Sequence, residues 1–196
     1  MVIGDMPFLS YQPSIADAIT NAGRFLKEAG AKAVKIEGGL EMCETIARMV
    51  ELGIPVMGHL GLTPQSVSAL GGFRVQGRSA AQAKKIVDDA RALEDAGAFA
   101  ILLEMVPDRV CQLITERAKD CFIISLGAGP SAHGQLLIYH DMFGLYPKFT
   151  PRMAKQYGHA GEVILPALLE LPFLAGDPAR IVAFLAPLLG TPPLIA

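Results

Sequence analysis

Short runs of apolar residues alternate along the chain with longer amphipathic segments. Clear apolar runs lie at residues 2–3, 33–36, 54–57, 98–103 and 121–126, and helical segments at about 15–29, 41–52, 80–96 and 107–119. The apolar runs contain few alternating polar residues, which is typical of parallel strands buried on both faces. The regular order of strand and helix therefore predicts an α/β fold.

The residues at the ends of the apolar runs favour a closed barrel over an open sheet. Asp5, Glu37, His59 and Glu104 stand at the carboxyl ends of four of the five clear runs. A barrel directs many successive strand ends toward one centre, where its active site is built. An open doubly wound sheet has its site at one switch point and draws on fewer strands. The pattern therefore favours a (β/α)8 barrel, the TIM barrel.

The length of the chain is short for a complete barrel of this kind. Such barrels have eight strands and usually about 250 residues, whereas this chain has 196. Weaker strand candidates lie at Leu136–Tyr139 and Val163–Leu165. We therefore expect the first one or two βα units to be missing, which would leave an open sheet edge. Because no break in composition occurs, residues 1–196 are expected to form a single partial barrel domain.

Composition and charge exclude several classes of protein. The chain is 52% hydrophobic and only 18% charged, which excludes disorder and suits a large core or subunit contacts. A net charge of −2 without a basic block argues against nucleic-acid and anionic-membrane partners. Cys43, Cys111 and Cys121 are widely spaced, which suits a reducing cytoplasm. The uncharged stretch 181–196 is shorter than a membrane span and contains prolines, so we expect a packed C-terminal helix and tail.

Two carboxylates and a lysine form the first group of candidate site residues. Asp5 and Glu37 end neighbouring strands, and their oxygen atoms suit Mg²⁺, which commonly takes one or two protein carboxylates. Helix capping or loop contacts are the structural alternative for both. Lys35 lies on the same side of its strand as Glu37 and would contact either an anionic substrate or an ion-pair partner.

A histidine and a third glutamate complete the set of candidates. His59 precedes Thr63 and Pro64, which predict the start of a short helix. Glu104 follows an apolar run, and a carboxylate is costly to ionise in such surroundings. We therefore expect its pKa to rise toward the range of a general base. A buried acid paired with Lys35 or Arg74 is the alternative for Glu104. No second histidine stands at a metal-ligand spacing, which argues against zinc.

Several segments resemble the ketopantoate hydroxymethyltransferase family, also called the 3-methyl-2-oxobutanoate hydroxymethyltransferase family. The resemblance extends from Val2 to about Lys155 and is most specific in residues 58–66 and 71–78. The matching segments are residues 4–8, 34–39, 58–66, 71–78, 103–107, 126–129 and 134–144.

The resemblance implies a barrel enzyme of pantothenate synthesis. It would transfer a hydroxymethyl group from 5,10-methylenetetrahydrofolate to 3-methyl-2-oxobutanoate through a Mg²⁺-stabilised enolate. Asp5 and Glu37 would be metal ligands, Lys35, His59 and Asp5 would contact the oxo acid, and Glu104 would be the base. The resemblance also implies a homo-oligomer, a decamer in characterised relatives.

The chain differs from the family pattern at its start. Family members carry two further βα units and a Gly-Asp-Ser motif before the position of Asp5, and that motif supplies another metal ligand and a substrate contact. Two alternatives stay open. One is another Mg²⁺-dependent enolate enzyme of the phosphoenolpyruvate mutase or lyase kind, which would not use folate. The other is a non-catalytic barrel remnant, against which the intact set of site residues argues.

Overall fold

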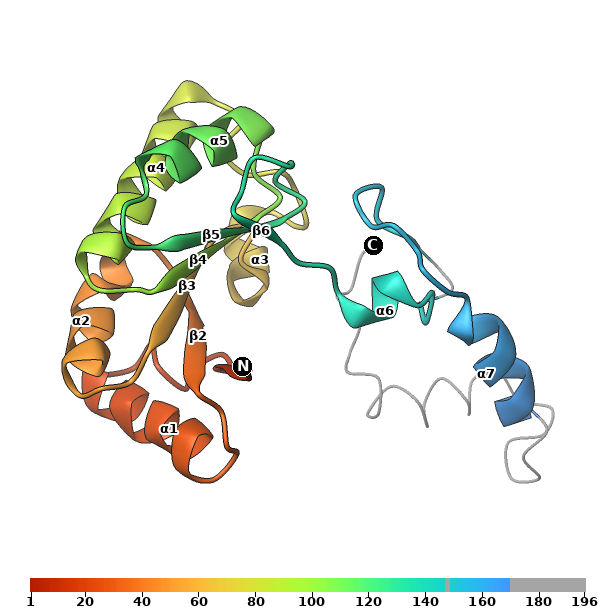
Figure 1. The fold of residues 1–196 in the computed structure, drawn as a ribbon, viewed down its shortest axis with the longest axis horizontal. Helices are drawn as coiled ribbons and strands as arrows, with labels where there is room; N and C mark the ends of the chain where they lie inside the picture. The colour runs from red at the N-terminus through yellow and green to blue at the C-terminus, as the bar shows by residue number, and fades with distance from the viewer. Residues whose placement is uncertain (147–148, 170–196) are drawn as a thin grey trace. The chain divides into compact units, whose positions relative to one another are not determined.

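The computed structural model describes residues 1–146 and 149–169 (Figure 1). The chain divides into two compact units, the first from Met1 to Leu136 and the second from Leu137 onward. The predicted site residues all belong to the first unit, and we describe the two units separately. The assignment of the chain to a single domain stays a prediction.

The first unit is built on a parallel sheet whose strands follow one another in sequence order. In the described residues the sheet has six strands. They are β1 (Ile3–Asp5), β2 (Ala33–Glu37), β3 (Val56–Gly61), β4 (Ala100–Glu104), β5 (Phe122–Leu126) and β6 (Gly134–Gln135). Every neighbouring pair is parallel. A parallel sheet in strict sequence order is a half-barrel, because each crossover returns the chain beside the strand just left.

The connecting helices cover one face of this sheet (Figure 1). They are α1 (Ile15–Lys27), α2 (Cys43–Glu51), α4 (Ala80–Asp95) and α5 (Asp108–Arg117), with the short helices η1 (Leu40–Met42), η2 (Pro64–Ser66) and α3 (Val67–Leu70) in the loops. The hydroxyl group of Ser14 caps α1 by accepting from the N–H of Asp17. Ser79 and Gln82 form a capping box at the start of α4.

The hydrophobic core lies between the sheet and these helices. Alternate strand residues such as Val34, Ile36 and Leu103 are completely buried and belong to one cluster with Met49 of α2 and Leu93 of α4. Because side chains alternate between the two faces of a strand, the residues between them project from the opposite face. That opposite face carries the polar side chains of the predicted site.

The structure confirms the expected α/β fold and its five clear strands. It also confirms the short helix after Thr63, which begins at Pro64 in η2. The sheet accounts for part of the predicted barrel, and the complete (β/α)8 barrel with its missing units stays a prediction. Among the described residues, no helix is both long and apolar enough to cross a membrane.

The second unit contains the helices α6 (Tyr139–Met142) and α7 (Ala160–Leu169). The two weaker strand predictions, at Leu136–Tyr139 and Val163–Leu165, both need correction. The strand expected at Leu136–Tyr139 lies two residues earlier, as β6, and Tyr139 begins α6. The strand expected at Val163–Leu165 is wrong, because these residues lie within α7. A continuous apolar run without alternation fits a helix as well as a strand. The predicted tail at 181–196 lies outside the described residues.

Candidate active site

Predicted site residues from β2, β3 and β4 project from the same face of the sheet, at the carboxyl ends of their strands. Lys35 and Glu37 are two residues apart on β2 and therefore share a face. Glu37 is in register with His59 on β3, and Gly61, two residues beyond His59, is in register with Glu104 on β4. The strand ends therefore bring these side chains together, as the sequence predicted.

The glycine at the end of β3 is required by this close packing. Gly61 has a φ of +93°, and a residue with a side chain adopts this backbone conformation only with strain. A Cβ atom added at Gly61 would overlap the carbonyl oxygen of Glu104. That carbonyl accepts a hydrogen bond from the N–H of Leu62 at 2.8 Å, so the ends of β3 and β4 are held together beside the site.

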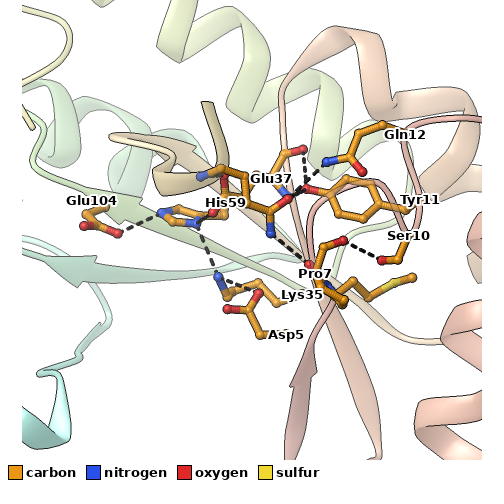
Figure 2. Close-up of polar contacts among 11 residues, drawn as sticks. Asp5, Pro7, Ser10, Tyr11, Gln12, Lys35, Glu37, His59 and Glu104 are labelled. Atoms are coloured by element: carbon orange, nitrogen blue, oxygen red, sulfur yellow. Dashed lines mark hydrogen bonds and ion pairs between the residues drawn. The ribbon is translucent and has the colours of Figure 1, made fainter. Parts of the chain in front are cut away.

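The five predicted side chains form a continuous series of polar contacts (Figure 2). Asp5 on β1 is in register with Lys35. Lys35 Nζ lies 2.9 Å from Asp5 Oδ1 and 3.4 Å from His59 Nδ1. His59 Nδ1 also lies 3.5 Å from Glu37 Oε1, and on the other side of the ring Nε2 lies 3.1 Å from Glu104 Oε2. The series therefore runs from β1 to β4, and the imidazole stands at its centre.

The imidazole of His59 is buried, and its surroundings change its acidity. Burial by itself would lower the pKa of His59, but the neighbouring carboxylates of Glu104 and Glu37 outweigh this effect and raise the pKa above the usual 6.5. The contact of Nε2 with Glu104 lacks hydrogen-bond geometry, so among the described residues this buried nitrogen has no hydrogen-bond partner. An unpartnered buried nitrogen is available to a ligand atom.

Glu104 is buried at the end of β4, with 9% of its surface exposed. Its close ionisable neighbour is His59. The alternative prediction had paired Glu104 with Lys35 or Arg74, and neither makes an ion pair with it among the described residues. A buried carboxylate next to an imidazole can accept a proton from a substrate carbon.

Asp5 and Glu37, the predicted Mg²⁺ ligands, carry carboxylate oxygen atoms, the kind of ligand that Mg²⁺ prefers. The side chain of Asp5 is largely exposed, and its contact with Lys35 engages one of its two oxygens. Glu37 Oε2 accepts a hydrogen bond from the backbone N–H of Gln65 at 3.0 Å. The described residues contain no group of three or more histidine, cysteine, aspartate or glutamate side chains placed for a metal. Two carboxylates are nevertheless a usual protein contribution to a Mg²⁺ site, which keeps several waters.

Sequence reasoning missed two side chains that contact the site. Tyr11, in the loop after β1, is completely buried, and its hydroxyl group accepts a hydrogen bond from the N–H of Glu37 at 3.0 Å. That hydroxyl donates to Gln65 Oε1 at 2.8 Å. Gln65 stands inside residues 58–66, the segment of most specific resemblance, which could have drawn attention to it. A lone loop tyrosine carries no such signal.

The parallel sheet and the series of polar contacts at its strand ends define a class of protein. This class consists of parallel α/β proteins whose polar site lies at the carboxyl ends of sequential strands, as in barrel enzymes. The model of one family of this class, ketopantoate hydroxymethyltransferase, matches residues 1–170. The chain belongs to the ketopantoate hydroxymethyltransferase family.

Curated relatives from three bacteria carry the name 3-methyl-2-oxobutanoate hydroxymethyltransferase. The relative from Carboxydothermus hydrogenoformans is 54% identical over 170 residues, which are 87% of this chain and 61% of the relative. The relative from Moorella thermoacetica is 54% identical over 168 residues, 86% of this chain and 62% of its own length. The relative from Clostridium kluyveri is 52% identical over 170 residues, which are 87% of this chain and 60% of the relative. The chain therefore spans about three fifths of the length of these relatives.

Among solved structures, a proposed deoxyribose-phosphate aldolase from Coccidioides immitis is similar over 65% of this chain and 48% of its own. Its sequence identity is 14% and its TM-score is 0.45.

Proposed function

We propose that the protein transfers a hydroxymethyl group from 5,10-methylenetetrahydrofolate to 3-methyl-2-oxobutanoate, giving 2-dehydropantoate for pantothenate synthesis. The names of its relatives support the transfer and its acceptor. The observation that carries the proposal is the series of contacts that joins Lys35, His59 and Glu104 at the strand ends. An ammonium group, an imidazole and a buried carboxylate are the groups that binding and deprotonating a 2-oxo acid require.

Glu104 is the proposed base. Its carboxylate would take the proton from C3 of the oxo acid, next to the ketone, and leave an enolate. Its place in the site supports this role, because the buried carboxylate lies at the end of β4 beside the imidazole of His59. The enolate carbon would then form a bond to the methylene carbon carried by folate. Both carbon–nitrogen bonds of that methylene group break, water supplies the hydroxyl group of the product, and the protons given up by C3 and by water go to the two nitrogen atoms of the released tetrahydrofolate.

Lys35, His59 and Asp5 are the proposed substrate contacts. The ammonium group of Lys35 would attract the carboxylate of the oxo acid, and Asp5, at 2.9 Å, orients that ammonium group. Nε2 of His59, which has no hydrogen-bond partner among the described residues, would donate to a substrate oxygen. Asp5 and Glu37 would hold Mg²⁺, which when bound polarises the ketone and so makes the C3 proton more acidic.

The deprotonation step can be tested without folate. In D₂O, with Mg²⁺ and the full-length protein, NMR should show loss of the C3 proton signal of 3-methyl-2-oxobutanoate. Omission of Mg²⁺ should stop the loss. A folded protein that leaves the C3 proton unexchanged would refute Glu104 as a base and the enolate route with it.

We further propose that the protein is a cytoplasmic homo-oligomer, with the family decamer as the expected state. The three cysteines are free, which supports a reducing compartment. The apolar composition supports subunit contacts.

A further inference from the structure

A hydrogen-bonded group beside Glu37 joins two loops of the site to the end of β2, and none of the roles proposed above includes it. We call Tyr11, Gln12 and Gln65 the support cluster. Tyr11 and Gln12 lie in the loop between β1 and α1, and Gln65 lies in η2 after β3 (Figure 2 shows the first two beside Glu37). The cluster therefore connects the loops that follow β1 and β3 to the end of β2.

Tyr11 holds the backbone at Glu37. Its hydroxyl group accepts from the N–H of Glu37 at 3.0 Å and donates to Gln65 Oε1 at 2.8 Å. The phenol stays protonated at physiological pH and keeps one donor and one acceptor role. Its oxygen is a fixed support for the strand end rather than a proton carrier.

Gln65 holds the side chain of Glu37. Its backbone N–H donates to Glu37 Oε2 at 3.0 Å. Its side-chain amide is held at both ends: Nε2 donates to the carbonyl of Met6 at 2.8 Å, and Oε1 accepts from Tyr11 and from Gln12 Nε2 at 3.0 Å. The orientation of the amide is fixed, since a reversed amide would turn an oxygen toward the carbonyl oxygen of Met6.

The consequence for Glu37 is a single carboxylate orientation. With the backbone N–H held by Tyr11 and Oε2 held by Gln65, Oε1 is directed toward His59 Nδ1, at 3.5 Å. A glutamate side chain that is free to rotate loses entropy when it binds a metal or orients a ring. A side chain already fixed by its neighbours avoids most of that loss.

We propose that Tyr11 and Gln65 are positioning residues that fix the Glu37 carboxylate for Mg²⁺ binding. This role rests on the proposed function, in which Glu37 is a metal ligand. Tyr11 and Gln65 would act through Glu37, to which both are hydrogen-bonded. Partners of metal ligands of this kind typically contribute about 10- to 100-fold to metal affinity.

The test compares Mg²⁺ binding in the wild type with binding in Tyr11→Phe and Gln65→Met. Tyr11→Phe removes one hydroxyl group and keeps the ring, and Gln65→Met keeps the length of the side chain but removes its amide. Thr115→Val is the matched control, because it removes a hydroxyl bonded to the Cys111 carbonyl in α5 at 2.9 Å. Isothermal calorimetry measures Mg²⁺ affinity directly, and C3 exchange is followed against Mg²⁺ concentration in parallel.

Both support-cluster variants should bind Mg²⁺ about tenfold more weakly, and saturating Mg²⁺ should restore their exchange rates. A purely structural role would lower the rate at every Mg²⁺ concentration and leave the half-saturating concentration unchanged. That result, or wild-type affinity in both variants, would overturn the positioning role while the proposed function stands.

Two further outcomes are decisive. If either variant fails to fold, as judged by circular dichroism, Gln12→Met replaces it. This variant removes only the bond to Gln65, so a smaller shift in the same direction supports the proposal and no shift overturns it. If the wild type neither binds Mg²⁺ nor exchanges the C3 proton, the proposed function fails and the positioning role fails with it.

Discussion

Replacing Glu104 with glutamine removes the proposed base and keeps its shape. Glu104 is 9% exposed, and its Oε2 lies 3.1 Å from His59 Nε2. A glutamine of nearly equal volume can occupy the same site at the end of β4. Its amide, however, cannot accept a proton from C3 of the oxo acid. The substitution therefore separates the chemistry of the position from its packing.

The size of the effect follows from the task of the carboxylate. A positioned general base contributes about 10²- to 10⁴-fold to the rate. At about 1.36 kcal/mol per tenfold, this range is about 3–5 kcal/mol of activation free energy. The other carboxylate that contacts His59, that of Glu37, lies against Nδ1 on the opposite side of the ring and is not placed to replace Glu104. We therefore expect C3 exchange to fall about 100-fold or more.

The assay is NMR detection of C3 deuterium exchange, with Mg²⁺ and without folate. Glu116→Gln is the matched control, because Glu116 is an exposed residue of α5 that accepts from Gln112 at 2.8 Å. This control should exchange at the wild-type rate. Wild-type exchange in Glu104→Gln would refute the assignment and move the role of base to His59.

Four further predictions concern the metal, the histidine, the end of β3 and the assembly. Glu37→Gln should abolish calorimetric Mg²⁺ binding without unfolding the protein; undiminished affinity would exclude Glu37 as a ligand. Because the pKa of His59 is raised, the stability it contributes is complete below pH 6.5 and is lost as the pH rises through its folded-state pKa. The thermal midpoint should therefore fall over that window in the wild type and fall less in His59→Gln, whereas equal slopes would contradict the raised pKa. Gly61→Ala should lower the free energy of unfolding in urea by about 2 kcal/mol or more, given its φ of +93°, and a wild-type urea midpoint would disprove this. Light scattering should report an oligomer, and a stable monomer would refute the proposed assembly.

The sequence allowed the main strands and the strand-end residues to be predicted because both depend on local patterns. Apolar runs without alternation indicated buried parallel strands, and the ionisable residues after them lie together in the structure. The contact between His59 and Glu104 could not be predicted, because it depends on how β3 and β4 align in register. The same holds for Tyr11, whose hydrogen bonds join residues 26 and 54 positions away.

The wrong strand prediction at Val163–Leu165 has a different cause. These residues lie in α7, which is ten residues long and contains Pro166, and no polar residue alternates with its apolar ones from Val163 onward. Pro166 did not decide between a strand and a helix. Proline disfavours the interior of both elements and is found at strand edges and in the first turn of helices. Local sequence alone therefore left the type of this element undetermined.

The most direct test of the proposed function is formation of its product. The full-length protein is incubated with Mg²⁺, 3-methyl-2-oxobutanoate and 5,10-methylenetetrahydrofolate, and 2-dehydropantoate is measured by mass spectrometry. We predict product that depends on folate and is lost in Glu104→Gln. A folded protein that exchanges the C3 proton but forms no 2-dehydropantoate with folate present would contradict the proposed transfer.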